Sequence, residues 1–86
     1  MLTYNMENRG ASSKFEYLYT LIKADIRAGR LRPGERMPSK RGLAEHLGVS
    51  VITVESAYAQ LVTEGYVTSR ARSGFFVSDT GIPPLF

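Results

Sequence analysis

The amino-acid sequence predicts a mainly α-helical domain of three helices followed by a small β-hairpin. Two observations support this fold class. Three segments with apolar residues at helical spacing each follow a serine that can cap a helix and precede a glycine that can end one. After the third segment, two short runs rich in β-branched and aromatic residues flank four residues that suit a hairpin tip.

The first helix is predicted to begin after Ser13 and to end near Ala28. Glu16 stands three residues after Ser13, which is the spacing of a capping box. Gly29 can adopt the left-handed conformation that ends a helix. The apolar face of this helix is formed by Phe15, Leu18, Tyr19, Ile22 and Ile26.

A turn and a short second helix come next. Residues 32–35 read Arg-Pro-Gly-Glu, and Leu31 and Met37 are the expected hydrophobic anchors of this turn, through a very short strand. Ser39 is the expected cap of the second helix, and Gly48 is its expected end. The buried stripe between them is Leu43, Ala44 and Leu47.

The third helix is predicted over residues 51–64, with Ser50 as its cap and Gly65 after its end. Its apolar residues follow the spacing i, i+3, i+4, i+7 and i+8, at Val54, Ala57, Tyr58, Leu61 and Val62. The hairpin strands are expected at residues 66–70 and 75–78, packed beside this helix. Phe76 is expected in the core, and Phe75 at an exposed position.

The three helices and the hairpin form one domain over residues 13–78. Residues 1–12 lack a sustained apolar period and are expected to be a flexible lead-in. Residues 79–86 contain a Pro-Pro pair and are expected to be a tail or the start of an interdomain linker.

The composition excludes several classes of protein. The 86 residues are 43% hydrophobic, which allows one small core, and they contain no cysteine and a single histidine. We therefore expect no metal site, and no nucleophile and base stand at a spacing typical of an enzyme. No apolar run approaches the roughly 20 residues that span a bilayer, and no signal peptide is evident, so a cytoplasmic, nucleoid-associated protein is expected.

The charge is mildly basic and unevenly distributed. The net charge is +3, and the basic residues gather in two places, Arg70 with Arg72 and, before them, Arg27, Arg30, Arg32, Arg36, Lys40 and Arg41. Such clusters favour an anionic partner, with nucleic acid as the first hypothesis and an ordinary solvated face as the alternative.

Helix, helix-turn-helix and hairpin together are the order of a winged helix-turn-helix domain. The second helix of the turn motif fits the roughly 12 Å major groove of B-DNA in such domains. Small domains of this shape also dock proteins, and the alternative function is a protein-interaction module that docks through Val51, Ile52 and Phe75.

Several motifs agree in type and spacing with one known family. They are Ile26-Arg27-Ala28-Gly29-Arg30-Leu31, Pro33-Gly34-Glu35-Arg36-Met37-Pro38-Ser39, Leu43-Ala44, Leu47-Gly48-Val49-Ser50 and Thr53-Val54. In these motifs the chain resembles the DNA-binding domain of the GntR family of bacterial transcription regulators, over residues 14–78. Residues 57–67 with Ser69-Arg70 and 73–77 are most similar to the MocR-like branch.

The resemblance has consequences for cofactors and assembly. MocR-like regulators join this domain through a linker to a large domain that resembles pyridoxal-phosphate aminotransferases, binds the cofactor, senses effectors and forms the dimer. Such a domain does not fit into 86 residues, so we expect an isolated DNA-binding domain without a cofactor. A monomer, or a weak homodimer on two half-sites, is expected.

Double-stranded DNA is the expected partner, with residues 51–64 in the major groove and the wing, residues 70–75, on the backbone or in the minor groove. The resemblance places at Arg41 an arginine that reaches DNA, whereas Ser39 and Lys40 either touch phosphates or cap the helix. The full set of expected contact residues is Ser39, Lys40, Arg41, Ser50, Val51, Ile52, Thr53, Ser56, Arg70, Arg72, Ser73 and Gly74.

The chain departs from the family pattern at the contact surface. Many family members have arginine where Val51 stands, and several branches have another where Glu55 stands, so thymine methyl groups are better ligands for this helix than guanine edges. Glu55 could accept from cytosine or orient Arg41, but a solvated or internally paired carboxylate is expected. Related sequences often have Pro-Gly in place of Ala71-Arg72, so the wing tip carries an additional charge.

Overall fold

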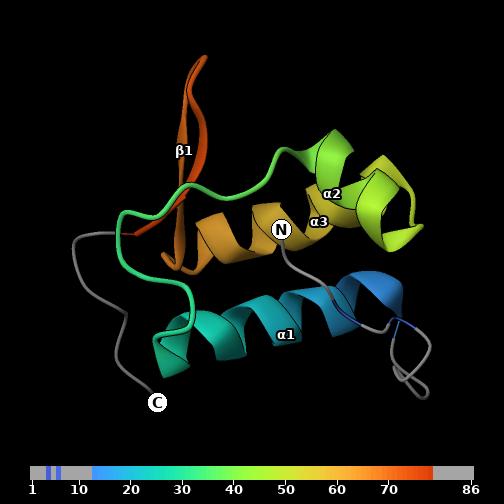
Figure 1. Cartoon of the computed structure of the whole chain (residues 1–86), viewed down its shortest axis with the longest axis horizontal. Helices are drawn as coiled ribbons and strands as arrows, with labels where there is room; N and C mark the ends of the chain where they lie inside the picture. Colours follow the sequence, from blue (N-terminus) through green and yellow to red (C-terminus); the bar gives the residue numbers. More distant parts are fainter. Residues whose placement is uncertain (1–3, 5, 7–12, 79–86) are drawn as a thin grey trace.

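The computed structural model describes Tyr4, Met6 and residues 13–78. In this part the elements are α1 (Lys14–Ala28), α2 (Lys40–Leu47), α3 (Val51–Thr63), β1 (Val67–Arg70) and β2 (Gly74–Val77). Figure 1 shows α1 beside α3, α2 at the start of α3, and the hairpin rising from the end of α3 on the side away from α1. The predicted fold class is confirmed, and α3 ends one residue before the predicted 64.

The predicted helix caps are present. The Oγ atom of Ser13 accepts a hydrogen bond from a backbone N–H of the first turn of α1 at 3.2 Å, and Ser39 and Ser50 do the same for α2 and α3 at 3.0 and 3.1 Å. Gly29 and Gly48 end α1 and α2 with φ of +84° and +71°. Local sequence therefore sets the bounds of these helices, because caps satisfy backbone groups that the helix itself leaves unpaired.

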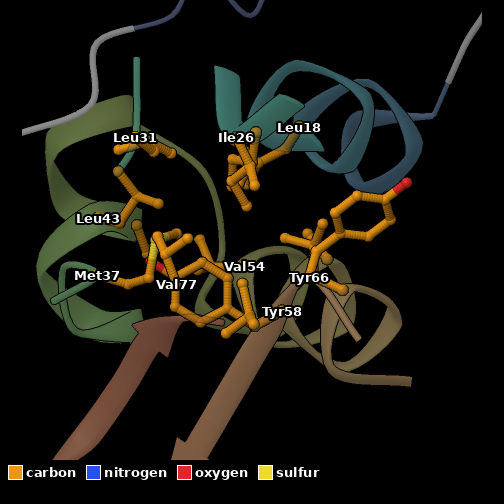
Figure 2. Packing of buried hydrophobic residues seen from close by; sticks show 14 of the residues in the cluster. Leu18, Ile26, Leu31, Met37, Leu43, Val54, Tyr58, Tyr66 and Val77 are labelled. Carbon is orange, nitrogen blue, oxygen red and sulfur yellow. The ribbon is translucent and has the colours of Figure 1, made fainter. Parts of the chain in front are cut away.

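The core lies between the three helices and the base of the hairpin. Figure 2 shows buried side chains from every one of these elements pointing toward one another. The buried apolar residues are Met6, Leu18, Ile22, Ile26, Leu31, Met37, Leu43, Ala44, Val54, Ala57, Tyr58, Leu61, Tyr66, Val67 and Val77. Tyr58 is fully buried, and its hydroxyl donates to the carbonyl oxygen of Pro38 at 2.8 Å, which fixes the chain just before α2 against α3.

The hairpin pairs Val67 with Val77 at its base and Arg70 with Gly74 at its tip. A third segment joins it, because Arg36 forms an isolated antiparallel bridge with residue 76. The backbone N–H of Met37 also donates to the carbonyl oxygen of residue 75 at 2.7 Å. This bridge confirms the very short strand that was expected between the turn and α2.

The expected positions of the two wing phenylalanines are wrong. Phe75 packs against the core, with its ring edge-to-face to Tyr58 at 5.0 Å between centroids. Phe76 lies on the opposite face, where the guanidinium of Arg70 is 4.4 Å from its ring centroid. The cause is the alternation of side chains along a strand: Val77 is buried at the hairpin base, so Phe75 shares its face and Phe76 does not.

Two residues from the segment expected as a lead-in contact the domain. Met6 is only 9% exposed and belongs to the core cluster. The hydroxyl of Tyr4 donates to Asp25 Oδ2 at 2.6 Å, and Arg30 Nε donates to Asp25 Oδ1 at 2.6 Å. Asp25 thus joins the segment before α1 to the segment that follows it.

A polar cluster also joins α1 to the end of α3. The hydroxyl of Tyr19 donates to Glu64 Oε1 at 2.5 Å, and Gln60 Nε2 donates to Glu64 Oε2 at 2.8 Å. Lys23 Nζ lies 3.2 Å from the Tyr19 hydroxyl and 3.7 Å from Glu64 Oε1. These donors, the Tyr19 hydroxyl first, lower the pKa of Glu64 below its ordinary value of 4.5.

Candidate nucleic-acid interface

The first turn of α3 presents apolar side chains to solvent. Val51 is 38% exposed and Ile52 is 72% exposed, and these are the exposed large hydrophobic residues of the described chain. Neither belongs to the core cluster or to the residues packed against it. These branched side chains therefore add little to the core and form an exposed apolar surface at the start of a capped helix.

The polar residues beside them are partly used by the fold. The Oγ atom of Ser50 caps α3 and lies 2.9 Å from the Oγ1 atom of Thr53, so the two hydroxyls are hydrogen-bonded to each other. Ser50 is exposed, whereas Thr53 and Ser56 are half-buried. Both hydroxyls therefore lie next to the positive end of the helix dipole.

Lys40 and Glu55 form an ion pair between α2 and α3. Lys40 Nζ donates to Glu55 Oε2 at 3.0 Å and lies 5.7 Å from the centroid of the Phe75 ring. The internally paired Glu55 that the sequence favoured is confirmed, and its partner is Lys40. Because both side chains are substantially exposed, the pair contributes little to stability and can exchange for a pairing with a ligand.

Arg41 is exposed in the first turn of α2, next to the cap residue Ser39. Among the described residues, the Arg41 side chain makes no hydrogen bond or ion pair, and its guanidinium therefore presents a fixed positive charge to solvent. Arg41 and the first turn of α3 thus share one end of the domain, where Figure 1 shows α2 and the start of α3 together.

The wing tip holds the remaining predicted contact residues. The N–H of Ser73 donates to the carbonyl oxygen of Arg70 at 3.1 Å, which closes a four-residue turn. Arg72 is the third residue of this turn and has φ of +65°, a value that favours glycine. The Pro-Gly of related sequences has glycine at that position, so this chain places an exposed arginine where the backbone would prefer a residue without Cβ.

Arg36 belongs to the wing surface, although the sequence gave it no contact role. A Cβ atom built on Gly74 would lie 3.6 Å from Arg36 Nη2 and 3.7 Å from Arg36 Nε, so the guanidinium lies against the glycine near the wing tip. These residues are far apart in sequence. The signal that could have found Arg36 was the very short strand before α2, which brings it beside β2.

The site residues therefore form two groups. The helix group consists of Ser39, Lys40, Arg41, Ser50, Val51, Ile52, Thr53 and Ser56, at the starts of α2 and α3. The wing group consists of Arg70, Arg72, Ser73 and Gly74 in the hairpin that stands apart in Figure 1, and of Arg36 from the segment before α2, whose guanidinium lies beside Gly74. The contact of Lys40 with Glu55 and with the Phe75 ring lies between them and links α2, α3 and the wing.

The described residues contain neither a metal-binding cluster nor a membrane-spanning helix. Searched over Tyr4, Met6 and residues 13–78, the acidic and histidine side chains form no group of three that could hold a metal ion. Within the same residues no helix combines the length and the apolar character that crossing a membrane requires.

Sequence comparison identifies the relatives of this chain. Residues 15–77 match the family described as bacterial regulatory proteins, gntR family. The chain is 52% identical over 69 residues to the transcriptional regulator TauR of Rhodobacter capsulatus, covering 80% of this chain and 14% of TauR. It is 45% identical over 67 residues to the probable rhizopine catabolism regulatory protein MocR of Rhizobium meliloti, covering 78% of this chain and 13% of MocR. The expected similarity to MocR-like regulators is confirmed, and these matches are to regulators, not to enzymes.

Solved structures show the same fold. YtrA from Sulfolobus acidocaldarius, a GntR-family transcription factor, superposes with a TM-score of 0.79 and 33% identity, over 85% of this chain and 77% of that one. AraR(DBD) in complex with operator ORE1 superposes with a TM-score of 0.73 and 28% identity, over 78% of this chain and 82% of that one. The family match covers most of the chain and the arrangement of helices and wing agrees. The chain therefore belongs to the GntR family of bacterial regulatory proteins.

Proposed function

We propose that this chain is a DNA-binding domain of a bacterial transcription regulator, and that it binds double-stranded DNA sequence-specifically. The family membership and the operator complexes of AraR support DNA as the ligand. The observation that carries the finer proposal is the exposed start of α3, where Ile52 is 72% exposed, together with the exposed Arg41 in the first turn of α2. A capped helix with an uncovered first turn is the shape that enters a major groove.

The chemistry of this first turn favours thymine. Val51 and Ile52 present methyl groups without polar atoms, and the C5 methyl of thymine is the apolar feature of the major groove. The sequence of α3 contains no arginine with which to read guanine, and its one carboxylate, Glu55, is paired with Lys40 in the free domain. The proposed target is accordingly a site in which α3 lies over A·T pairs.

The wing supplies contacts to phosphates. Residues 67–77 contain Arg70 and Arg72 and no carboxylate, so the hairpin is purely cationic. We assign the wing to the backbone or to the minor groove beside the site, where an arginine is attracted by the negative potential. If Lys40, Arg41, Arg70 and Arg72 each neutralise a phosphate, the slope of log K against log[salt] is roughly −3 to −4 per protomer.

A protein-docking function has less support. The docking patch would consist of Val51, Ile52 and Phe75, but Phe75 packs on Tyr58 and is turned toward the core. Two exposed apolar side chains fall well short of the roughly 800 Å² per partner that a stable interface buries. Because the exposed apolar surface is so small, we expect a monomer or a weak homodimer in solution. As a DNA-binding domain, the chain is expected in the cytoplasm with the nucleoid.

The test is selection of bound fragments from a random duplex pool, followed by fluorescence anisotropy at one salt concentration. The selected duplex should bind at least about tenfold more tightly than its scrambled version. Replacing one contacted thymine by deoxyuridine removes a methyl group worth about 0.8 kcal/mol, which is about a fourfold loss of affinity.

The variant Ile52→Ala should bind the thymine and deoxyuridine duplexes equally, because the side chain that covers the methyl group is gone. Thr63→Ala, an exposed change at the other end of α3, is the matched control and should keep the difference. Equal binding of selected and scrambled duplexes would refute sequence-specific recognition. A deoxyuridine effect that survives in Ile52→Ala would refute the role of Ile52.

A further inference from the structure

We propose that the segment between α1 and α2 is a docking edge for an extended acidic segment of another protein. The docking edge consists of residues 30–31 and 35–39, which line one groove of about 640 Å³. None of the described residues that line this groove belongs to α3 or to the hairpin. The inference therefore goes beyond the proposed function and does not depend on it.

Residues 35–37 are the outer strand of a small sheet in which β2 is the middle strand. The carbonyl oxygen of Glu35 accepts from β2 at 2.8 Å, and the N–H of Met37 donates to β2 at 2.7 Å. Arg36 lies between these two bonds, opposite Phe76. Its own N–H and carbonyl group therefore point away from β2. Figure 1 shows the segment crossing the hairpin on its way to α2.

The backbone of Arg36 can pair with a further strand. Within the described residues neither its N–H nor its carbonyl oxygen makes a hydrogen bond, and the residue is exposed. An exposed strand edge with an unpaired donor and acceptor is a template to which an extended peptide adds. One residue of the added strand can exchange both backbone hydrogen bonds with Arg36.

The groove beside this edge has an apolar floor and a cationic lining residue. Leu31 and Met37 line the groove and also belong to the core, with exposures of 5% and 3%. The side chain of Arg30 lines it too and is 63% exposed, although its Nε donates to Asp25. An extended segment alternates its side chains, so it can place apolar groups on the floor and acidic groups outward.

The charge of the segment favours an acidic occupant. Residues 25–36 contain four arginines and two carboxylates, a net charge of +2. Directly opposed residues of an antiparallel pair share a face, so Arg36 lies on the same side of the sheet as Phe76. An acidic residue of the added strand that stands opposite Arg36 would face this guanidinium.

The docking edge fits a peptide better than a nucleic acid. A nucleic-acid backbone presents phosphate acceptors and no N–H donor, so it could not satisfy the carbonyl oxygen of Arg36. The carboxylate of Glu35, which also lines the groove, would repel a phosphate. A peptide backbone supplies a donor and an acceptor at the spacing of a strand, and the occupant is therefore assigned to protein.

The first experiment measures peptide binding to the 86-residue chain by fluorescence anisotropy. The probe is a labelled peptide of alternating glutamate and valine, and its binding should weaken as salt rises. A lysine–valine peptide should bind at least about tenfold more weakly, because it places cations beside arginine. The glutamate–valine peptide methylated on its backbone nitrogens should lose at least about fivefold in affinity, because it cannot donate to Arg36.

Variants of the chain then separate the backbone edge from the charge. Proline is tolerated at a strand edge whose N–H faces solvent, so Arg36→Pro removes this donor together with the guanidinium. It should bind about fivefold more weakly than Arg36→Ala, which removes only the guanidinium. Arg30→Gln should lose about two- to fivefold. Arg27→Gln, an exposed change outside the groove, is the matched control and should bind like wild type.

Equal binding of the methylated and unmethylated peptides would overturn the inference, and this comparison needs no variant, so it holds even if Arg36→Pro unfolds. Equal binding of the glutamate and lysine peptides would also overturn it, as would equal losses for Arg27→Gln and Arg30→Gln. A random duplex that binds Arg36→Pro more weakly than Arg36→Ala, with no peptide binding, would assign the edge to DNA instead. Ile52→Ala should bind the peptide like wild type, and a loss there would contradict a separate site.

Discussion

Replacing Arg72 by glycine is expected to stabilise the domain and to weaken its binding to DNA. Arg72 has φ of +65°, where a residue with Cβ is disfavoured by about 1–2 kcal/mol. Glycine removes this strain but makes the unfolded chain more flexible, which offsets about 0.5–1 kcal/mol. The expected net gain in the free energy of unfolding is therefore about 0.5–1 kcal/mol.

Thermal unfolding followed by circular dichroism measures the stability change. In a domain of this size, 1 kcal/mol shifts Tm by roughly 4–8 °C, so Arg72→Gly should raise Tm by about 2–8 °C. Anisotropy titrations over a salt series measure the change in DNA binding. The slope of log K against log[salt] should decrease in magnitude by about 0.9, because one phosphate contact is gone.

Two further variants separate strain from charge at the same position. Arg72→Lys keeps the charge and the strain, so its Tm and its salt slope should both match wild type. Arg72→Asn tolerates the left-handed conformation without a charge, so it should gain stability and lose slope as glycine does. A lower Tm for Arg72→Gly would refute the strain argument, and an unchanged slope would refute the contact assigned to Arg72.

Three other predictions concern interactions inside the domain. Glu55→Gln should raise the affinity for non-specific DNA several-fold, because it releases Lys40 and removes a carboxylate from the proposed DNA-facing side. Glu45→Gln makes the same change of charge and should leave this affinity unchanged. Anisotropy titrations with a random duplex measure both. Tyr58→Phe should lower the free energy of unfolding by about 1–2 kcal/mol in urea titrations, because the carbonyl oxygen of the half-buried Pro38, before α2, loses its donor. The pKa of Glu64 is lowered in the folded state, so the ionised carboxylate contributes to stability above its ordinary pKa of 4.5, and this contribution is lost as pH falls through the folded pKa. Glu64→Gln should therefore show a shallower fall of Tm below about pH 4.5 than wild type. A fall as steep as in wild type would contradict this linkage.

The helices could be predicted from the sequence because their signals are local. Each cap serine bonds a backbone N–H three residues ahead, and the glycines at 29 and 48 adopt the left-handed conformation next to the helix they end. The burial of Phe75 and Phe76 could not be assigned in the same way. Their faces depend on which strand residue meets Val67, and a shift of one residue exchanges the two sides.

In the candidate site too, local patterns could be predicted from the sequence, whereas contacts between distant segments could not. Val51 and Ile52 were predicted as contact residues because they stand in the first turn of a capped helix and off its apolar stripe, and Arg41 because the family resemblance places an arginine there. Arg36 was missed because its role depends on pairing with a strand about 40 residues later in the chain. Lys40 was predicted either to touch a phosphate or to cap the helix. In the free domain it is paired with Glu55, a partner on a different helix that spacing alone does not reveal.

The proposed surface separates residues that add affinity from residues that discriminate between bases. A phosphate contact is the same for every sequence, so the arginines at positions 70 and 72 can strengthen binding without improving discrimination. Methyl contacts in the major groove are weak individually but differ between bases, and Ile52 is the most exposed large apolar side chain of the described residues. The paired Glu55 keeps the base-reading face near neutrality, because its carboxylate offsets the nearest lysine. Discrimination between bases should therefore follow changes in α3, and the salt slope should follow changes in the wing and in Lys40 and Arg41 on α2.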